Sequence, residues 1–183
     1  MHHNAKLLLL LGLLMLMAFS GLFVGAASLS ISQVMEHLIA FSSDDFVIQQ
    51  YRLPRMLLAI SVGAGLGLSG VLVQGVIRNP LASPDLMGIS AGAGLAATAS
   101  LVWFPNAPVS LLPIFAMCGG VFAAGLIALL AWWSQPTPAK LALIGIAVSA
   151  FLASCIDFLL VTNPIEINTA MVWLTGSLWG RNW

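Results

Sequence analysis

A serine between two glycines is the first candidate for chemistry in this sequence. Gly88, Ser90 and Gly92 form a GxSxG string, which in hydrolases places the serine on a sharp turn between a strand and a helix. A serine nucleophile also needs a base within hydrogen-bond reach. The 3 histidines all lie outside the long apolar segments, at His2, His3 and His37. An intramembrane hydrolase is therefore the weaker alternative.

Two arginines flank a proline in the string Arg52-Leu53-Pro54-Arg55. Pro54 suits the first turn of a helix, so both cations lie near the positive end of a helix dipole, which costs each of them about 0.3–1 kcal/mol. An acidic group should offset this cost. Lipid phosphates reached by snorkelling, a nearby carboxylate or an acidic patch on a partner protein would each serve.

Asp157 and Gln74 are polar residues associated with otherwise apolar runs. An unpaired carboxylate at the centre of a bilayer costs about 2.5–3.5 kcal/mol on insertion scales. Asp157 should therefore face protein or a watery path, and a structural pairing and a translocation role both remain open. Gln74 is the second candidate for a polar group on such a path.

Glycines recur at helical spacing in two apolar segments. Gly63 and Gly67 form a GxxxG pair followed by Gly70, and Gly88 and Gly92 repeat the pattern further on. Small residues let neighbouring backbones approach closely inside a membrane. We therefore predict that these glycines pack helices together, and that the first of the two helices is surrounded by other helices rather than by lipid.

The composition decides which solvent surrounds these residues. Of 183 residues, 60% are hydrophobic and only 7% are charged, whereas soluble proteins carry about 25% charged residues. Membrane lipid must replace water around most of the chain. The six Lys and Arg are scattered and balanced by six Asp and Glu, which excludes the basic footprint of a nucleic-acid-binding protein.

The sequence lacks nucleotide and metal motifs. Without a GxxxxGK[ST] string, any ATP that drives this protein must bind to another chain. Cys118 and Cys155 lie in apolar runs and form neither a CxxC pair nor a cluster with histidine, which indicates packing rather than a disulfide or a zinc site. We therefore expect no metal and no directly bound cofactor.

Five apolar segments reach the length of about 20 residues that a spanning helix needs. They cover residues 6–27, 56–77, 86–104, 109–133 and 141–162. Prolines mark their ends, since a missing N–H stops a helix, and nothing alternates with period two as barrel strands do. We predict an all-α polytopic membrane protein with a single transmembrane domain over residues 1–183. The first segment could instead be a cleaved signal peptide, but its apolar run is longer than such peptides carry.

Two stretches outside these segments, residues 28–55 and 165–183, are more polar than the segments themselves. In the first, Ser30 precedes apolar residues at helical spacing, which predicts a short interfacial helix. In the second, Trp173, Trp179 and Trp183 are spaced to lie in a headgroup belt. The orientation is undecided by the positive-inside rule, because each side of the membrane would carry an equal number of Lys and Arg. These residues are Lys6, Arg78 and Lys140 on one side and Arg52, Arg55 and Arg181 on the other.

Four strings, together with the glycine-rich helix, resemble one family. They are Tyr51-Arg52-Leu53-Pro54-Arg55, Arg78-Asn79-Pro80-Leu81-Ala82-Ser83-Pro84-Asp85, Gly88-Ile89-Ser90 and Leu174-Thr175-Gly176-Ser177-Leu178-Trp179-Gly180-Arg181. Their order resembles the FecCD-type permeases of bacterial ABC importers for iron chelates, haem and vitamin B12, and within that family the ferric dicitrate permeases. The resemblance runs from the first apolar segment to Trp183.

The resemblance implies a permease subunit of roughly ten transmembrane helices in the bacterial inner membrane, with the N-terminus in the cytoplasm and residues 28–55 in the periplasm. Its partners would be a second permease subunit, identical or different, cytoplasmic ATPases that bind the ATP, and a periplasmic substrate-binding protein. Arg52 and Arg55 would dock that binding protein, which supplies the acidic partner that the dipole argument requires. The segment 141–162 is the best candidate for lining the pathway.

By this resemblance the chain is expected to be the N-terminal half of a permease, without the loop that contacts the ATPase, and therefore unable to transport alone. The function expected is import of ferric dicitrate or a similar iron–siderophore. A vitamin B12 or haem permease of the same family and a non-transporting membrane fragment or interaction module remain as alternatives.

Overall fold

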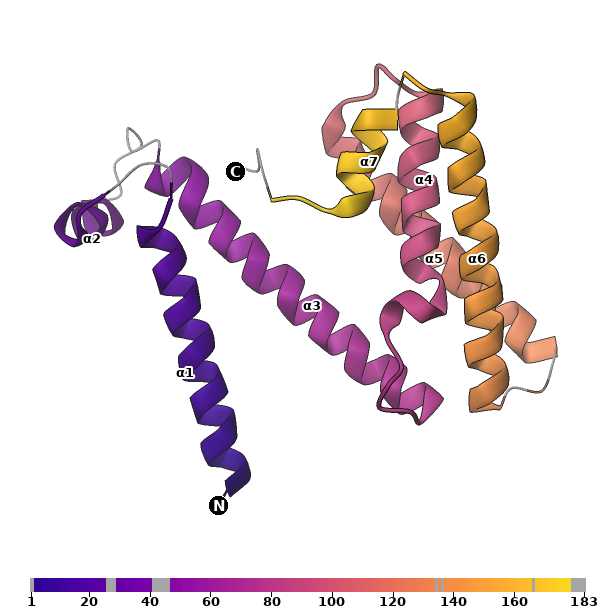
Figure 1. The fold of residues 1–183 in the computed structure, drawn as a ribbon, viewed down its shortest axis with the longest axis horizontal. Coiled ribbons are helices and arrows are strands. Elements are labelled where there is room, and N and C mark those ends of the chain that lie inside the picture. The colour runs from indigo at the N-terminus through magenta and orange to yellow at the C-terminus, as the bar shows by residue number, and fades with distance from the viewer. Residues whose placement is uncertain are drawn as a thin grey trace. The chain divides into compact units, whose positions relative to one another are not determined.

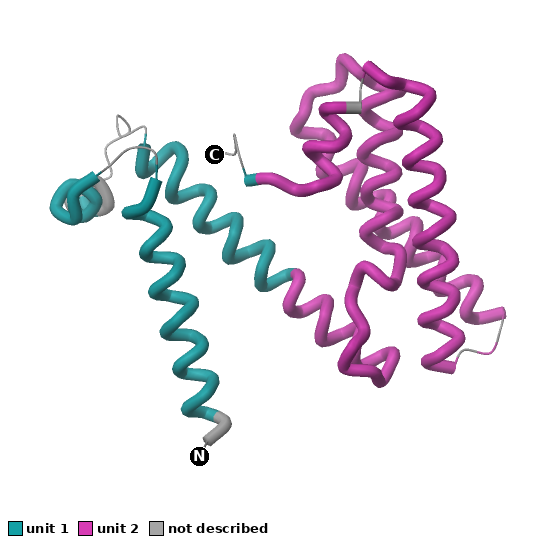
Figure 2. Tube along the Cα trace, viewed as in Figure 1, with its two compact units in different colours: residues 1–65, 178–183 teal, residues 66–177 magenta. Residues whose placement is uncertain are grey.

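The computed structural model describes the chain in six ranges and divides it into two compact units (Figures 1 and 2). The described residues are 2–25, 29–40, 47–133, 135, 137–165 and 167–178. Unit 1 comprises residues 1–65 and 178–183, and unit 2 comprises residues 66–177. Every regular element within the described ranges is helical, which confirms the all-α prediction.

Four helical runs are long and apolar enough to cross a membrane in the part of the chain that the structure describes. They belong to α1 (His2–Phe23), α3 (Leu53–Ile77), α5 (Leu112–Trp133) and α6 (Pro138–Thr162). Two of the runs extend through an adjoining turn, to Ile48–Ile77 and Val109–Trp133. These runs coincide with four of the five segments expected from the sequence.

The remaining expected segment, residues 86–104, forms a shorter helix. The α4 helix covers Ile89–Trp103, which is 15 residues and therefore roughly 22 Å long, less than the about 30 Å of a bilayer core. A 3-10 helix, η2 (Pro84–Met87), precedes it, and Gly88 separates the two with φ 72°. Among the described residues, four helices therefore meet the length criterion for a span and α4 is a shorter apolar helix, so the predicted count of five is approximate.

Unit 1 is held together where α1 ends. The α2 helix (Ile31–Ala40) begins with a capping box, in which Ser30 N–H donates to Gln33 Oε1 at 2.9 Å and Gln33 N–H donates to Ser30 Oγ at 3.4 Å. Leu22, Val34 and Ile48 form a buried cluster. This cluster joins the end of α1 to α2 and to the turn that precedes α3. The α2 helix is the short helix predicted after Ser30.

Unit 2 is a bundle in which α4 packs most closely against α5 (Figure 1). A Cβ added at Gly92 would meet the Gly119 carbonyl oxygen at 2.7 Å and would also collide with Ala123 Cβ. A Cβ added at Gly119 would collide with the Gly92 carbonyl oxygen and with Ala96. The two helices therefore touch backbone to backbone, which only glycine allows.

The α6 and α7 helices complete unit 2. Val148 and Leu152 of α6 share a buried cluster with Ala123 and Ile127 of α5. The short α7 helix (Ile167–Thr175) buries Ala170 to 1% exposure in a cluster with Ile156 and Leu160.

The predicted tryptophan belt is described only at its first position. Trp173 is half-buried on α7, whereas Trp179 and Trp183 lie outside the described residues. The α7 helix thus packs on α6 through Ala170 and carries the half-buried ring of Trp173.

The contact between α4 and α5 generates a prediction about stability. Gly119→Ala should destabilise the folded protein by about 1–3 kcal/mol, because the new methyl group overpacks a backbone contact. Thermal unfolding of the purified protein in nanodiscs measures the effect. Gly125→Ala on the same helix is the control, since nothing lies within 4 Å of a Cβ there. Equal melting temperatures for the two variants would contradict the close contact.

Candidate functional site

The two arginines of the RLPR string lie where a wide helical turn passes into α3. A π-helix, η1 (Ile48–Arg52), precedes α3, and Arg52 N–H donates to the Val47 carbonyl at 3.1 Å. The α ladder begins at Leu53, so Pro54 is the second residue of α3, where a proline costs no internal hydrogen bond. The wide turn therefore leads into Pro54 with the N–H groups of Arg52 and Leu53 both hydrogen-bonded.

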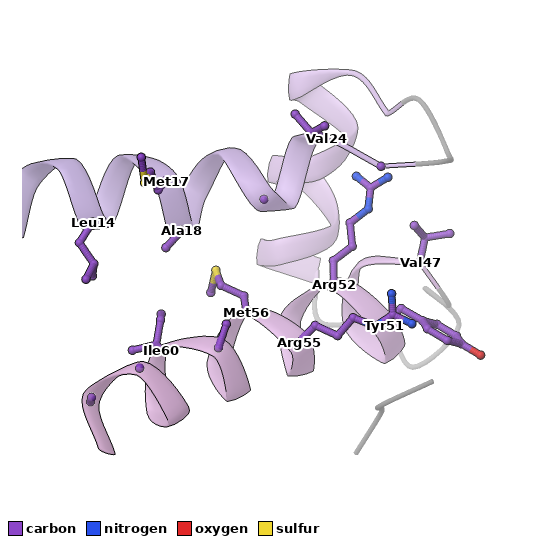
Figure 3. Close-up of a pocket in the computed structure, with 15 residues that line it drawn as sticks. Leu14, Met17, Ala18, Val24, Val47, Tyr51, Arg52, Arg55, Met56 and Ile60 are labelled. Carbon is purple, nitrogen blue, oxygen red and sulfur yellow. The ribbon is translucent and has the colours of Figure 1, made fainter. Parts of the chain in front are cut away.

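Arg52 is directed back toward α1 (Figure 3). Its Nη1 donates to the Leu22 carbonyl oxygen at 2.6 Å, in a part-buried setting. Leu22 lies in the last turn of α1, where carbonyls lack partners within the helix and the helix dipole is negative. The charge of Arg52 is therefore offset within the chain by a helix end, a partner that the sequence had not revealed.

Arg55 follows a different course. Its Cζ lies 5.3 Å from the centroid of the Tyr51 ring, which is a cation–π distance. Its Nε is buried and has no hydrogen-bond partner in the described chain. Figure 3 shows its side chain running beside Tyr51, away from the end of α1 that Arg52 contacts. Arg55 therefore keeps hydrogen-bonding capacity that Arg52 uses internally.

The carboxylates nearest in sequence fall outside the described side chains. Asp44 and Asp45 belong to the range 41–46, and the side chain of Glu36 is likewise not described. The alternative of a nearby carboxylate partner therefore stays a prediction. Arg181, the third cation expected on this side, also lies outside the described residues.

An open apolar groove of about 960 Å³ lies between α1 and α3, and Arg52 and Arg55 line one end of it (Figure 3). Leu14, Met17 and Ala18 line it from α1, and Met56 and Ile60 line it from α3. The groove is therefore apolar along most of its length and carries two guanidinium groups at one end.

The three glycines predicted to pack α3 against other helices have no neighbours in the described chain. A Cβ added at Gly63, Gly67 or Gly70 would meet nothing within 4 Å. In the most apolar stretch of this helix, no residue is buried within the described structure. Gly63 also lines the groove. Their packing role stays a prediction, whereas Gly92 lies in the tight contact described above.

The second string of the sequence, residues 78–85, forms a compact connection between α3 and α4. Arg78 ends α3 in the left-handed region with φ 55°, and Asn79 N–H donates to the Gln74 carbonyl at 3.2 Å. Asn79 Oδ1 then accepts from Leu81 N–H at 2.9 Å. Gln74 Nε2 donates to the Ala82 carbonyl at 3.4 Å, so its amide binds this connection.

Gly88 holds the connection against α6. It has a positive φ of 72°, and a Cβ there would lie 3.1 Å from Ser149 N and 3.2 Å from the Gly145 carbonyl oxygen. Both the backbone conformation and the space exclude a side chain. The contact is closer still at Gly145, which sequence reasoning missed: the Leu86 carbonyl oxygen would lie 2.7 Å from its added Cβ.

Ser90 donates from Oγ to Asp85 Oδ1 at 2.9 Å, which ties the start of α4 to the 3-10 helix before it. This bond gives the serine a local structural role. No group of three or more His, Cys, Asp or Glu side chains that could hold a metal occurs among the described residues. Cys118 and Cys155 are free thiols.

Asp157 lies exposed on α6, while the neighbouring Ile156 is buried on the face that packs within unit 2. The carboxylate is therefore directed away from the described packing, and its role stays a prediction. Two residues missed from the sequence also lie in this unit. Gly119 is visible in hindsight as half of a Gly-Gly pair, and Thr98 is only 1% exposed with no hydrogen-bond partner for Oγ1 in the described chain.

The Ser90 contact predicts a small structural effect and no nucleophilic chemistry. Ser90→Ala should lower the unfolding free energy by about 0.5–1.5 kcal/mol, because one hydrogen bond is lost. Ser61→Ala is the control, since its hydroxyl bonds only the Leu57 carbonyl in its own helix. Melting in nanodiscs and labelling with a serine-directed fluorophosphonate provide the readouts. Labelling that disappears in Ser90→Ala would instead restore the hydrolase alternative.

Comparison with known proteins gives the same family from sequence and structure. The sequence model of the FecCD transport family matches residues 12–183. The chain is 46% identical over 178 residues to the Fe(3+)-citrate import system permease protein YfmE of Bacillus subtilis, covering 97% of this chain and 54% of that protein. It is 51% identical over 138 residues to the Fe(3+) dicitrate transport system permease protein FecD of Escherichia coli, covering 75% and 43%.

A solved structure is also similar. It is described as an inward-facing conformation of an ABC transporter of the metal-chelate type, and it matches with a TM-score of 0.78 and 29% sequence identity. The match covers 98% of this chain and 56% of that one. The chain thus spans about half the length of the curated relatives it matches.

Proposed function

Because the chain belongs to the FecCD transport family, we propose that it supplies membrane-spanning helices of an ABC-importer permease for ferric dicitrate or a similar iron–siderophore chelate. The observation that carries this proposal is the 46% identity over 97% of the chain to a permease named for ferric citrate import. The long apolar helices fit a multi-pass inner-membrane protein.

The relatives are transport permeases, so the chain is assigned a transport role rather than catalysis. We propose that ATP is bound and hydrolysed by separate ATPase subunits, that a second permease subunit completes the pathway, and that a periplasmic binding protein delivers the chelate. This chain's residues contribute no nucleotide site to that scheme, since the sequence carries no phosphate-binding loop.

The proposed orientation places the N-terminus, Arg78 and Lys140 in the cytoplasm and the RLPR string at the periplasmic surface. In that orientation Arg52 and Arg55 lie at the docking face for the binding protein. A partner surface rich in Asp or Glu would match their charge, and such complementarity raises the rate of association and fixes the docking register.

We assign the pathway to α6, with Asp157 as its polar group. The exposed position of this carboxylate supports the assignment, because an intramembrane acid is costly unless it faces water or another polar group. Gln74 fits a pathway role less well, since its amide is directed at the Ala82 carbonyl of the connection after α3.

The test is uptake of radioactive iron by proteoliposomes that contain the complete permease complex, its ATPases and an excess of binding protein. Ferric citrate should be transported in an ATP-dependent manner, and haem and cobalamin should not compete. The double variant Arg52→Glu, Arg55→Glu should lower the initial rate about tenfold at limiting binding protein, because like charges then meet across the docking face.

Raising the concentration of binding protein should restore part of the lost rate, since the change acts on docking rather than on turnover. Lys140→Glu serves as the control, because it reverses one positive charge at the opposite end of the membrane. Uptake of cobalamin in place of ferric citrate would contradict the proposed substrate, and unchanged docking of the double variant would contradict the proposed interface.

A further inference from the structure

We propose that the groove between α1 and α3 binds an anionic phospholipid, whose acyl chain lies along the two helices and whose phosphate meets Arg55. The inference goes beyond the proposed function, because it concerns a lipid site and not the route of the chelate. It requires only that the arginine end of the groove lies at the level of the lipid headgroups, and it holds for either orientation of the chain in the membrane.

The walls of the groove are apolar over most of its length. Of the 15 residues that line it, those with polar side chains are Tyr51, Arg52 and Arg55, and all three lie at one end. Further along, Leu14 of α1 and Ile60 of α3 point toward each other across the groove (Figure 3). An occupant of this groove must therefore be apolar along the helices and polar at the arginine end.

The groove has the length of one membrane leaflet. Arg55 and Ala64 both line it from α3, and the 9 residues between their positions correspond to roughly 14 Å along a helix. One leaflet provides about 15 Å of hydrocarbon, half of the bilayer core. An acyl chain with its phosphate at Arg55 would thus reach Ala64. Gly67 and Gly70 lie further along α3 and do not line the groove, so their predicted helix packing is a separate matter.

The charge at the polar end requires an anion. The Arg55 guanidinium lies over the Tyr51 ring at 5.3 Å, and its buried Nε has no hydrogen-bond partner in the described chain. None of the described residues that line the groove is acidic. Arg52 adds a second positive charge, although its Nη1 donates to the Leu22 carbonyl. A phosphate fits this end, because its oxygens accept hydrogen bonds from the planar fork of an arginine.

A phospholipid is the occupant that satisfies both ends of the groove. Free phosphate would meet the charge and leave the apolar walls uncovered, whereas a hydrocarbon alone would leave the guanidinium groups without an anion. A zwitterionic headgroup carries its own cation, which competes for the phosphate. An anionic phospholipid has no such competitor, and basic groups at headgroup level are attracted to anionic lipids.

Photo-crosslinking of lipid to the full chain in nanodiscs tests the proposal. The nanodiscs consist of phosphatidylcholine with a small fraction of phosphatidylglycerol that carries a diazirine on its acyl chain. Adducts should concentrate on residues 14–25 and 56–64, which line the groove. Phosphatidylcholine with the same diazirine should give about fivefold fewer adducts there. Equal yields from the two lipids, or adducts spread evenly over all spanning helices, would overturn the site.

The charge at Arg55 can be removed or retained separately from the groove. Arg55→Gln should lower the yield from phosphatidylglycerol about fivefold, and Arg55→Lys should retain most of it, because the positive charge remains. Lys6→Gln is the matched control, since it removes one positive charge near the other end of α1 and does not line the groove. An unchanged yield in Arg55→Gln, or an equal fall in Lys6→Gln, would contradict the phosphate contact.

Filling the groove tests the acyl-chain part of the site with every charge retained. Gly63 lines the groove, and nothing lies within 4 Å of a Cβ there, so Gly63→Leu places a side chain in the groove without a clash. It should lower the yield of adducts on the facing residues of α1. Gly65→Leu is the control, because Gly65 is equally uncrowded and does not line the groove. Equal yields from the two variants would show that the lipid lies elsewhere.

The complete permease complex decides between a lipid and a protein helix as the occupant. The same lipid adducts should form in it. A benzophenone attached at Ala18→Cys, with Cys118 and Cys155 replaced by serine, should then crosslink to lipid. Its crosslinking to another polypeptide segment, with the lipid adducts lost, would overturn the proposal. Failure of the complex to import ferric citrate would count against the proposed function and leave the lipid result standing.

Discussion

Where a helix ends or its ladder of hydrogen bonds is interrupted, backbone N–H and C=O groups lose their partners within the helix, and other groups must bond them. Two such places dominate the described structure. Before α3 the wide turn η1 bonds Arg52 N–H to the Val47 carbonyl. Between α3 and α4 the side chains of Gln74 and Asn79 bond the backbone. Two of the four family strings are thus places where the helical ladder is interrupted and the freed backbone groups find other partners.

The same constraint explains where the few charges lie. A guanidinium can remain near a membrane only if something satisfies it, and helix ends are the strongest acceptors that an apolar chain offers. Arg52 uses the end of α1, and Arg55 uses an aromatic ring and keeps a donor in reserve. The two arginines of the RLPR string therefore have different contacts within the described chain.

Glycine placement follows from the absence of a hydrophobic drive between helices in lipid, where close backbone contact must supply the attraction. Gly92 and Gly119 bring α4 and α5 together, and Gly88 seats the connection on α6. The glycines of α3 have no such neighbour in the described chain, although the sequence pattern predicts the same use. In the proposed permease, helices beyond those described here would pack against that face.

Most of the helices could be predicted from the sequence because prolines and polar residues mark their ends. The predicted segment 109–133 coincides with the run Val109–Trp133. The start of α4 could not be predicted in this way, since residues 86–88 are apolar or small and only the φ of Gly88 shows that they turn. The Arg52 contact was missed for a different reason: its partner is a backbone carbonyl 30 residues away, and every residue type carries that group. Gly145 was missed because a lone glycine in a helix has no distinctive spacing.

The central claim is that the RLPR end of α3 faces the periplasm as part of an importer's docking surface. Labelling with a membrane-impermeant maleimide in intact cells tests it most directly, in a background with Cys118 and Cys155 replaced by serine. Val47→Cys should react from outside, and Lys140→Cys should react only after the inner membrane is permeabilised. Reaction of Lys140→Cys from outside, with Val47→Cys protected, would contradict the orientation and the docking surface together.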